Sequence, residues 1–163
     1  MRYHNITKDD MKNGDGLRAV LWLAGCEHAC PGCHNPVTWD AAGGLPFDQA
    51  ARDELFAELS KDYVAGVTFS GGDPLHPQNR DGVAALSREI RARFPGKTIW
   101  LYTGYLWEAC RSLEAVRLAD VLVDGPFLRE QAVSTLHWRG SANQRIIDVR
   151  RTLAQNQLVL HAE

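Results

Sequence analysis

The stretch "RAVLWLAGCEHACPGCH", Arg18 to His34, joins a short apolar run to a loop that carries three cysteines. The run Arg18–Ala24 is bounded by Gly16 and Gly25, which predicts a buried strand that ends where the cysteines begin. Three chemistries are compatible with such a loop: covalent attachment of c-type haem, a thiol redox pair, and ligation of a metal or a metal cluster. The rest of the chain decides among them.

Length and charge limit the class of protein. The chain has 163 residues, which is the size of one domain that can bury a core without disulfides, so we expect a single domain over residues 1–163. Charged residues make up 23% of the chain and the formal net charge is −2. This balance predicts neither a nucleic acid nor an anionic membrane as partner.

The N-terminal stretch "MRYHNITKDDMKNGDG" is too polar to be a secretory signal, and no apolar run reaches the length of about 18 residues that a membrane span needs. We therefore expect a cytoplasmic protein. Thiols stay reduced in that compartment, so a cysteine cluster there is expected to hold metal or to do redox chemistry rather than to form structural disulfides.

Strand and helix patterns alternate along the chain. After the first strand, the predicted strands are Ala65–Ser70, Thr98–Thr103 and Asp120–Gly125; the predicted helices cover Phe47–Lys61, Val83–Phe94 and Leu106–Arg117; weaker strand patterns occur at Arg145–Val149 and Gln157–His161. This alternation is typical of βαβ units, so we expect an α/β fold with a parallel sheet.

A polar or glycine-rich segment directly follows each of the four main predicted strands. The cysteines follow the first, and the other three are Ser70–Asp73, Thr103–Gly104 and Asp124–Gly125. The carboxyl ends of parallel strands share one edge of a sheet or barrel, where α/β folds build their sites. We therefore expect these four segments to form one composite site.

The haem and redox hypotheses each leave something unexplained. Residues Cys30–His34 match the C-x-x-C-H pattern of c-type haem, but they follow a predicted strand, and no export signal precedes them. A redox pair of Cys30 and Cys33 leaves Cys26 without a role, and Pro36 opposes a helix starting at the pair.

A metal site accounts for all three thiols. Structural zinc would need a fourth ligand, which His28 or a distant residue would have to supply, since His34 is adjacent to Cys33. The spacing Cys26-x3-Cys30-x2-Cys33 gives one thiolate fewer than a fully protein-ligated 4Fe-4S cluster, which would leave one iron open to an outside ligand. The fourth cysteine, Cys110, is expected to be a buried, inert thiol on the apolar face of its helix.

The CxxxCxxC motif after the first strand and "FSGGDPL", Phe69 to Leu75, resemble the two signature motifs of radical S-adenosylmethionine enzymes. Further segments extend the resemblance, in order and up to Asp148, to a narrower family, the activases of anaerobic ribonucleoside-triphosphate reductases. These segments are "NGDGLR", "GCEHACPGCHNPVTWD", "SGGDPLHPQN", "PGKTIWLYTGY", "VLVDGPF" and "WRGSANQRIID".

The resemblance implies a small partial (β/α) barrel of parallel strands with two cofactors. Cys26, Cys30 and Cys33 would bind three irons of a 4Fe-4S cluster, and S-adenosylmethionine would chelate the fourth iron. The residues implied in cofactor contact are Gly32, Cys33, His34, Gly71, Gly72, Asp73 and Thr103, with Asp124 as a further pocket residue and with no side-chain acid or base. The superfamily often has an aromatic residue where this chain has Gly32, so stacking on the adenine would have to come from elsewhere.

The implied activity is formation of a glycyl radical on the anaerobic reductase, which would be a protein substrate, with electrons from a low-potential donor such as flavodoxin. Two alternatives remain open at this level. One is another small radical S-adenosylmethionine enzyme that acts on a small molecule, and the other is a non-catalytic zinc-binding module.

Overall fold

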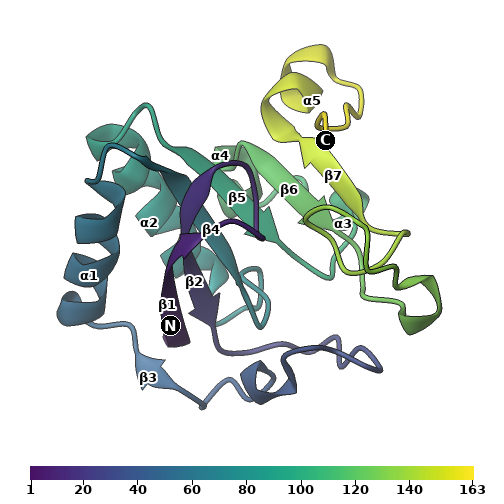
Figure 1. Cartoon of the computed structure of the whole chain (residues 1–163), viewed down its shortest axis with the longest axis horizontal. Coiled ribbons are helices and arrows are strands. Elements are labelled where there is room, and N and C mark those ends of the chain that lie inside the picture. The colour runs from purple at the N-terminus through teal and green to yellow at the C-terminus, as the bar shows by residue number, and fades with distance from the viewer.

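The computed structural model describes all residues from Met1 to Glu163 and contains one seven-stranded sheet in the order β3-β1-β2-β4-β5-β6-β7 (Figure 1). The strands are β1 (Arg2–Asp10), β2 (Leu17–Leu23), β3 (Leu45–Pro46), β4 (Val64–Gly71), β5 (Thr98–Tyr102), β6 (Val121–Asp124) and β7 (Arg145–Asp148). The helices are α1 (Gln49–Leu59), α2 (Arg80–Arg93), α3 (Trp107–Cys110), α4 (Glu114–Leu118) and α5 (Val149–Gln155). The predicted α/β class is confirmed.

The centre of the sheet consists of β2, β4, β5 and β6, which pair in parallel. These are the four strands that the apolar runs predicted. Asp48 caps the start of helix α1, and its carboxylate accepts a hydrogen bond from the Ala51 amide at 2.9 Å. The helix buries Ala51, Leu55 and Leu59, which share one face at helical spacing. Helix α2 likewise buries Val83, Leu86 and Ile90 against the same side of the sheet.

Antiparallel strands extend this parallel centre on both sides. Strand β1 pairs with β2 and with the two-residue β3, and β7 pairs with β6. The sequence pattern predicted no strand at β1, since Ile6 is its only buried residue. The weaker pattern at Arg145–Val149 did predict β7. The one at Gln157–His161 was wrong, because that segment makes only an isolated bridge between Leu160 and Ile147.

The helix predicted over Leu106–Arg117 is two short helices, α3 and α4, separated at residues 111–113. Leu106, the first residue of the predicted helix, was expected on its buried apolar face, but 50% of its surface is exposed. Cys110 nevertheless lies in the core as predicted, with 1% of its surface exposed.

The two faces of the sheet differ. The helices and the main core cover one face, which receives Leu21, Phe69 and Leu101. The other face carries Trp100, Tyr102 and the fully buried Arg18, whose guanidinium donates to uncharged oxygens, among them Thr68 Oγ1 at 2.8 Å and Val67 O at 2.7 Å. Burial lowers the Arg18 pKa to about 10.

Candidate functional site

Loops that follow β2, β4, β5 and β6 meet around one cavity of about 150 Å³ at the carboxyl edge of the sheet. The lining residues are Cys26, His28, Cys30, Cys33 and Trp39 from the first connection; Ser70, Gly71, Gly72 and Asp73 from the second; Tyr102, Thr103 and Gly104 from the third; and Gly125, Phe127 and Gln144 from beyond β6. The predicted composite site is therefore present as a single cavity.

The cysteine loop, Cys26–Cys33, presents three free, half-buried thiols to this cavity. Its start is held by Thr38 and Trp39, whose carbonyls accept from the Gly25 and Cys26 amides at 2.8 and 3.1 Å. The chain turns between Cys30 and Cys33, with the Cys33 amide donating to the Cys30 carbonyl at 3.1 Å. All three thiols of the motif therefore face one space.

The chemistry of the donor set fits an iron-sulfur cluster. No group of three or more His, Cys, Asp or Glu side chains is placed to hold one metal ion. A 4Fe-4S cluster makes a different demand, because each thiolate binds a different iron, and three thiolates on one loop satisfy it for three irons. Burial raises the pKa of Cys26, so a bound metal would be needed to favour its thiolate.

The glycine loop after β4 packs directly on residues 23–25, from which the cysteine loop starts. The Gly72 and Asp73 amides donate to Leu23 O and Gly25 O, each at 2.7 Å. A Cβ on Gly72 would lie 2.5 Å from Gly25 O, and one on Gly71, where φ is +100°, would lie 2.5 Å from Leu23 N. Only glycine allows the two backbones to come this close.

The buried Asp73 carboxylate links three of the loops. Its oxygens accept from Thr103 Oγ1 at 2.9 Å and from the Gly104 amide at 3.0 Å on the β5 loop, and from the Leu75 amide at 2.8 Å on its own loop. His28 Nε2, on the cysteine loop, lies 2.6 Å from Asp73 Oδ2. Asp73 therefore caps its own turn and also connects the cysteine loop to β5.

His28 is one of the two options for a fourth zinc ligand, the other being a residue distant in sequence. The hydrogen bond to Asp73 raises the His28 pKa, and the ring packs edge-on against Tyr105 with centroids 4.6 Å apart. With Nε2 engaged by a carboxylate, the ring contributes to the connection between loops.

The structure separates the other predicted contact residues into two groups. Cys33, Gly71, Gly72, Asp73 and Thr103 line the cavity. Gly32 and His34 do not line it: a Cβ on Gly32 would meet the Arg129 guanidinium, and the His34 ring lies against Phe127 with centroids 5.2 Å apart.

Asp124, the further predicted pocket residue, also does not line the cavity. Its buried carboxylate accepts from the Trp107 amide at 2.8 Å and from Arg145 Nε at 3.1 Å. The Asp124 carboxylate thus connects the start of α3 to β7 and stabilises the fold.

Several lining residues were not singled out in the sequence. Ser70 and Gly104 belong to segments that were expected at the composite site, although neither was named as a contact residue, and Tyr102 lies one position before the end of the predicted strand Thr98–Thr103. Phe127 and Gln144 lie within segments that carried the family resemblance. Trp39 had no assigned role and lines the cavity through the return of the chain beside Gly25.

None of the helices is both long and apolar enough to span a membrane.

Comparisons with known proteins agree with this site. A family described as a 4Fe-4S single cluster domain matches residues 12–147. A protein of Enterobacteria phage T4 named anaerobic ribonucleoside-triphosphate reductase-activating protein is 45% identical over 146 residues, which cover 90% of this chain and 93% of that protein. A protein of the same name from Escherichia coli strain K12 is 42% identical, over 92% of this chain and 100% of that protein. Another, from Vibrio cholerae, is 43% identical, over 90% of this chain and 97% of that protein. The chain therefore belongs to the family of anaerobic ribonucleoside-triphosphate reductase-activating proteins and carries their 4Fe-4S single cluster domain.

Proposed function

We propose that this protein is a radical S-adenosylmethionine enzyme that forms a glycyl radical on an anaerobic ribonucleoside-triphosphate reductase, with residues 1–163 acting as a single domain. The observation that carries the proposal is the convergence of three thiols and the Gly71-Gly72-Asp73 loop on one cavity. Family membership supplies the substrate, since the relatives are named for activating that reductase.

In this proposal Cys26, Cys30 and Cys33 each bind one iron of the cluster, and the amino and carboxylate groups of S-adenosylmethionine bind the fourth. The Gly71 and Gly72 backbone, which has no Cβ, lets the methionine end approach closely. Thr103 and Asp73 hold the β5 loop beside it, and main-chain atoms of Gly32 and His34 complete the contacts around the cluster.

When bound, the two cofactors would supply one-electron cleavage of the sulfonium C–S bond, giving methionine and a carbon radical that takes a hydrogen atom from a glycine Cα. The electron would come from an external low-potential donor such as flavodoxin, in the cytoplasm. The residues of this chain position the reactants and exclude water, and no side chain needs to act as an acid or a base.

The test is anaerobic reconstitution with iron and sulfide, followed by electron paramagnetic resonance of the reduced protein with and without S-adenosylmethionine. We expect a 4Fe-4S signal that changes when the cofactor is added, and a glycyl radical when the reductase is present. A colourless protein with one bound zinc would contradict the proposal. Cofactor cleavage without a radical on the reductase would instead favour a small-molecule substrate.

Single replacement of Cys26, Cys30 or Cys33 by alanine should abolish the cluster. Cys110→Ala is the matched control, because it also removes a thiol. That thiol belongs to helix α3 and is buried in the hydrophobic core. Loss of the cluster in the Cys110 variant would show that the ligand assignment is wrong.

A further inference from the structure

The side chain of Arg129 lies against the cysteine loop. A Cβ on Gly32 would lie 2.5 Å from Arg129 Nε and 3.0 Å from Arg129 Nη2, so the guanidinium fills the space that a side chain at residue 32 would take. Gly32 directly precedes Cys33, which binds one iron in the proposed function. The positive charge of Arg129 is therefore located at the turn that carries Cys30 and Cys33.

The geometry of this turn explains why the space is open. Pro31 and Gly32 occupy its two central positions, Gly32 has a φ of +77°, and the Cys33 amide donates to the Cys30 carbonyl at 3.1 Å. This is the pattern of a type II turn, which favours proline at its second residue and glycine at its third. The glycine that the turn requires thus also leaves room for the guanidinium.

The backbone on both sides of Arg129 is fixed to the rest of the molecule. The Leu128 amide donates to Oγ of the buried Ser141 at 3.1 Å, and the Ala142 amide donates to the Gln131 carbonyl at 2.8 Å. The position of the Arg129 side chain is therefore set by a well-anchored segment.

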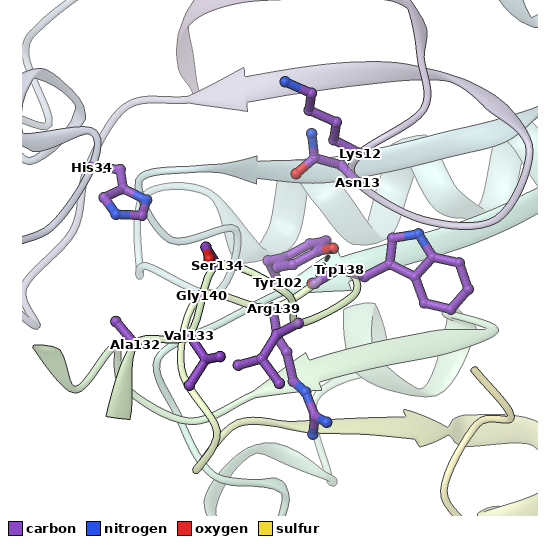
Figure 2. A pocket seen from close by; sticks show the side chains of 11 residues that line it. Lys12, Asn13, His34, Tyr102, Ala132, Val133, Ser134, Trp138, Arg139 and Gly140 are labelled. Atoms are coloured by element: carbon purple, nitrogen blue, oxygen red, sulfur yellow. Dashed lines mark hydrogen bonds between the residues drawn. The ribbon is translucent and has the colours of Figure 1, made fainter. Parts of the chain in front are cut away.

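This segment runs beside the cysteine loop over several residues. The ring of Phe127 lies against that of His34, with centroids 5.2 Å apart. His34 and Ala132 both line a larger cavity of about 740 Å³, and Figure 2 shows them at the same end of it. The contact between Arg129 and Gly32 thus belongs to a continuous set of contacts.

The charge of Arg129 is not neutralised within the chain. Its exposed guanidinium has no hydrogen-bond or ion-pair partner. The two carboxylates nearest to the cysteines, those of Glu27 and Asp73, face His76 and His28 instead. Arg129 therefore contributes a full positive charge beside the cysteine loop.

We propose that Arg129 makes the cluster easier to reduce, by placing this unpaired positive charge at the Cys30–Cys33 turn. The inference rests on the proposed function and adds to it a residue that assists the electron donor. Three thiolates outweigh the positive charge of a 4Fe-4S core, so the loaded site is anionic. One electron from the external low-potential donor adds one negative charge, and no bond or proton changes in this step. A nearby cation stabilises the product of that step more than the reactant, which raises the reduction potential.

The experiment compares a series in which the charge at residue 129 is kept, removed or reversed: Arg129→Lys, Arg129→Gln and Arg129→Glu. Each protein is reconstituted with iron and sulfide, and its reduction potential is measured by redox titration followed by electron paramagnetic resonance, before S-adenosylmethionine is added. Arg129→Gln should reduce the equilibrium constant for reduction about three- to tenfold, which lowers the potential by about 30–59 mV for one electron. Arg129→Glu should lower it further, and Arg129→Lys should stay close to the unmodified protein.

Arg151→Gln is the matched control, because Arg151 is also exposed but lines a cavity with Ala65 and Thr98, at the amino edge of the parallel strands. Its potential should equal that of the unmodified protein. Salt provides a second control, since the Debye length falls from about 10 Å at 0.1 M to about 3 Å at 1 M. The difference between Arg129→Gln and the unmodified protein should shrink over this range.

The outcomes separate this inference from the proposed function. Equal potentials in Arg129→Gln and the unmodified protein would overturn the inference. So would a Lys variant that behaves like the Gln variant, or a difference that salt does not change, because either result would indicate altered packing rather than charge. If the unmodified protein forms no 4Fe-4S cluster, the proposed function itself fails.

Discussion

His28 Nε2 lies 2.6 Å from Asp73 Oδ2, and this contact is the one hydrogen bond that joins residues 27–32 to the molecule outside the cysteine loop. The only other polar contact from that stretch to residues outside the cysteine loop joins Glu27 Oε1 and His76 Nε2 at 3.5 Å. Within the same stretch Ala29 has a φ of +47°, which a side chain disfavours. The position of the three thiols therefore depends strongly on His28.

Replacing His28 by leucine should loosen the cysteine loop. The change removes a donor from a buried carboxylate, which should lower the free energy of unfolding by about 1–3 kcal/mol. It should also reduce the iron bound per chain on reconstitution, because the thiols are no longer held in place. Calorimetry of the cluster-free protein and iron analysis would measure both effects.

His28→Gln is the control for that experiment, because its amide can still donate to Asp73. It should retain more of the iron than His28→Leu. Equal losses in the two variants would show that the hydrogen bond does not position the loop.

Thr103→Val should destabilise the protein by about 1–3 kcal/mol, since the Thr103 hydroxyl donates to Asp73 and accepts from the Tyr105 amide at 3.2 Å. Urea unfolding would measure the change, and Thr103→Ser should keep most of the stability.

Because Thr103 and His28 donate to the same carboxylate, the free-energy change of the double variant Thr103→Val/His28→Leu should deviate from the sum of the two single effects by at least about 0.5 kcal/mol. Simple additivity would contradict the shared role of Asp73.

Gly72→Ala should cost about 1–3 kcal/mol or more, because the new methyl would lie 2.5 Å from Gly25 O and 2.9 Å from Thr38 O, both backbone atoms. Gly96→Ala is the matched control, since a Cβ there has no atom within 4 Å. That control should change stability by less than about 1 kcal/mol, in the stabilising direction. Thermal unfolding of both cluster-free variants would test the difference, and similar values would refute the close packing of the two loops.

Cys110 should behave as an inert thiol. Burial raises its pKa from 9.0 to about 12, so native protein at pH 8 should react with iodoacetamide far more slowly at Cys110 than unfolded protein does. The raised pKa also sets a direction for stability: the contribution of the neutral thiol is present below pH 9 and is lost as the pH rises from 9 towards 12. Cys110→Ser, which shortens the side chain and brings a more polar group into the core, should be less stable than Cys110→Ala.

Apolar patterning was sufficient to predict the centre of the fold. Strands such as Val121–Asp124 are buried along their whole length, so they appear in sequence as short apolar runs. Strand β1 could not be found in this way, because many of its residues are polar and some, such as Asn5 and Lys8, are exposed. Its pairing with β2 holds it in the sheet. The break between α3 and α4 was missed because Leu113 packs against the core from a non-helical position.

The cysteine and glycine loops could be predicted as a site because each follows a recognisable strand. The connection between them could not, since His28 and Asp73 are 45 positions apart and neither residue type implies the other. The same holds for Gln144, which reaches the cavity only because β7 returns antiparallel beside β6. Asp124 shows the reverse case, in which a residue at the right strand end turns away to bind Arg145.

The alternation along β5 has a consequence for insertions and deletions. Ile99 and Leu101 enter the core beneath the helices, while Trp100 and Tyr102 belong to a second, smaller cluster on the other face of the sheet. Adding or removing one residue inside this strand would exchange the two sets, placing the aromatic residues under the helices and the aliphatic ones on the other face. Change in chain length should therefore be confined to the connections, and within the four parallel strands this family should vary by replacement alone.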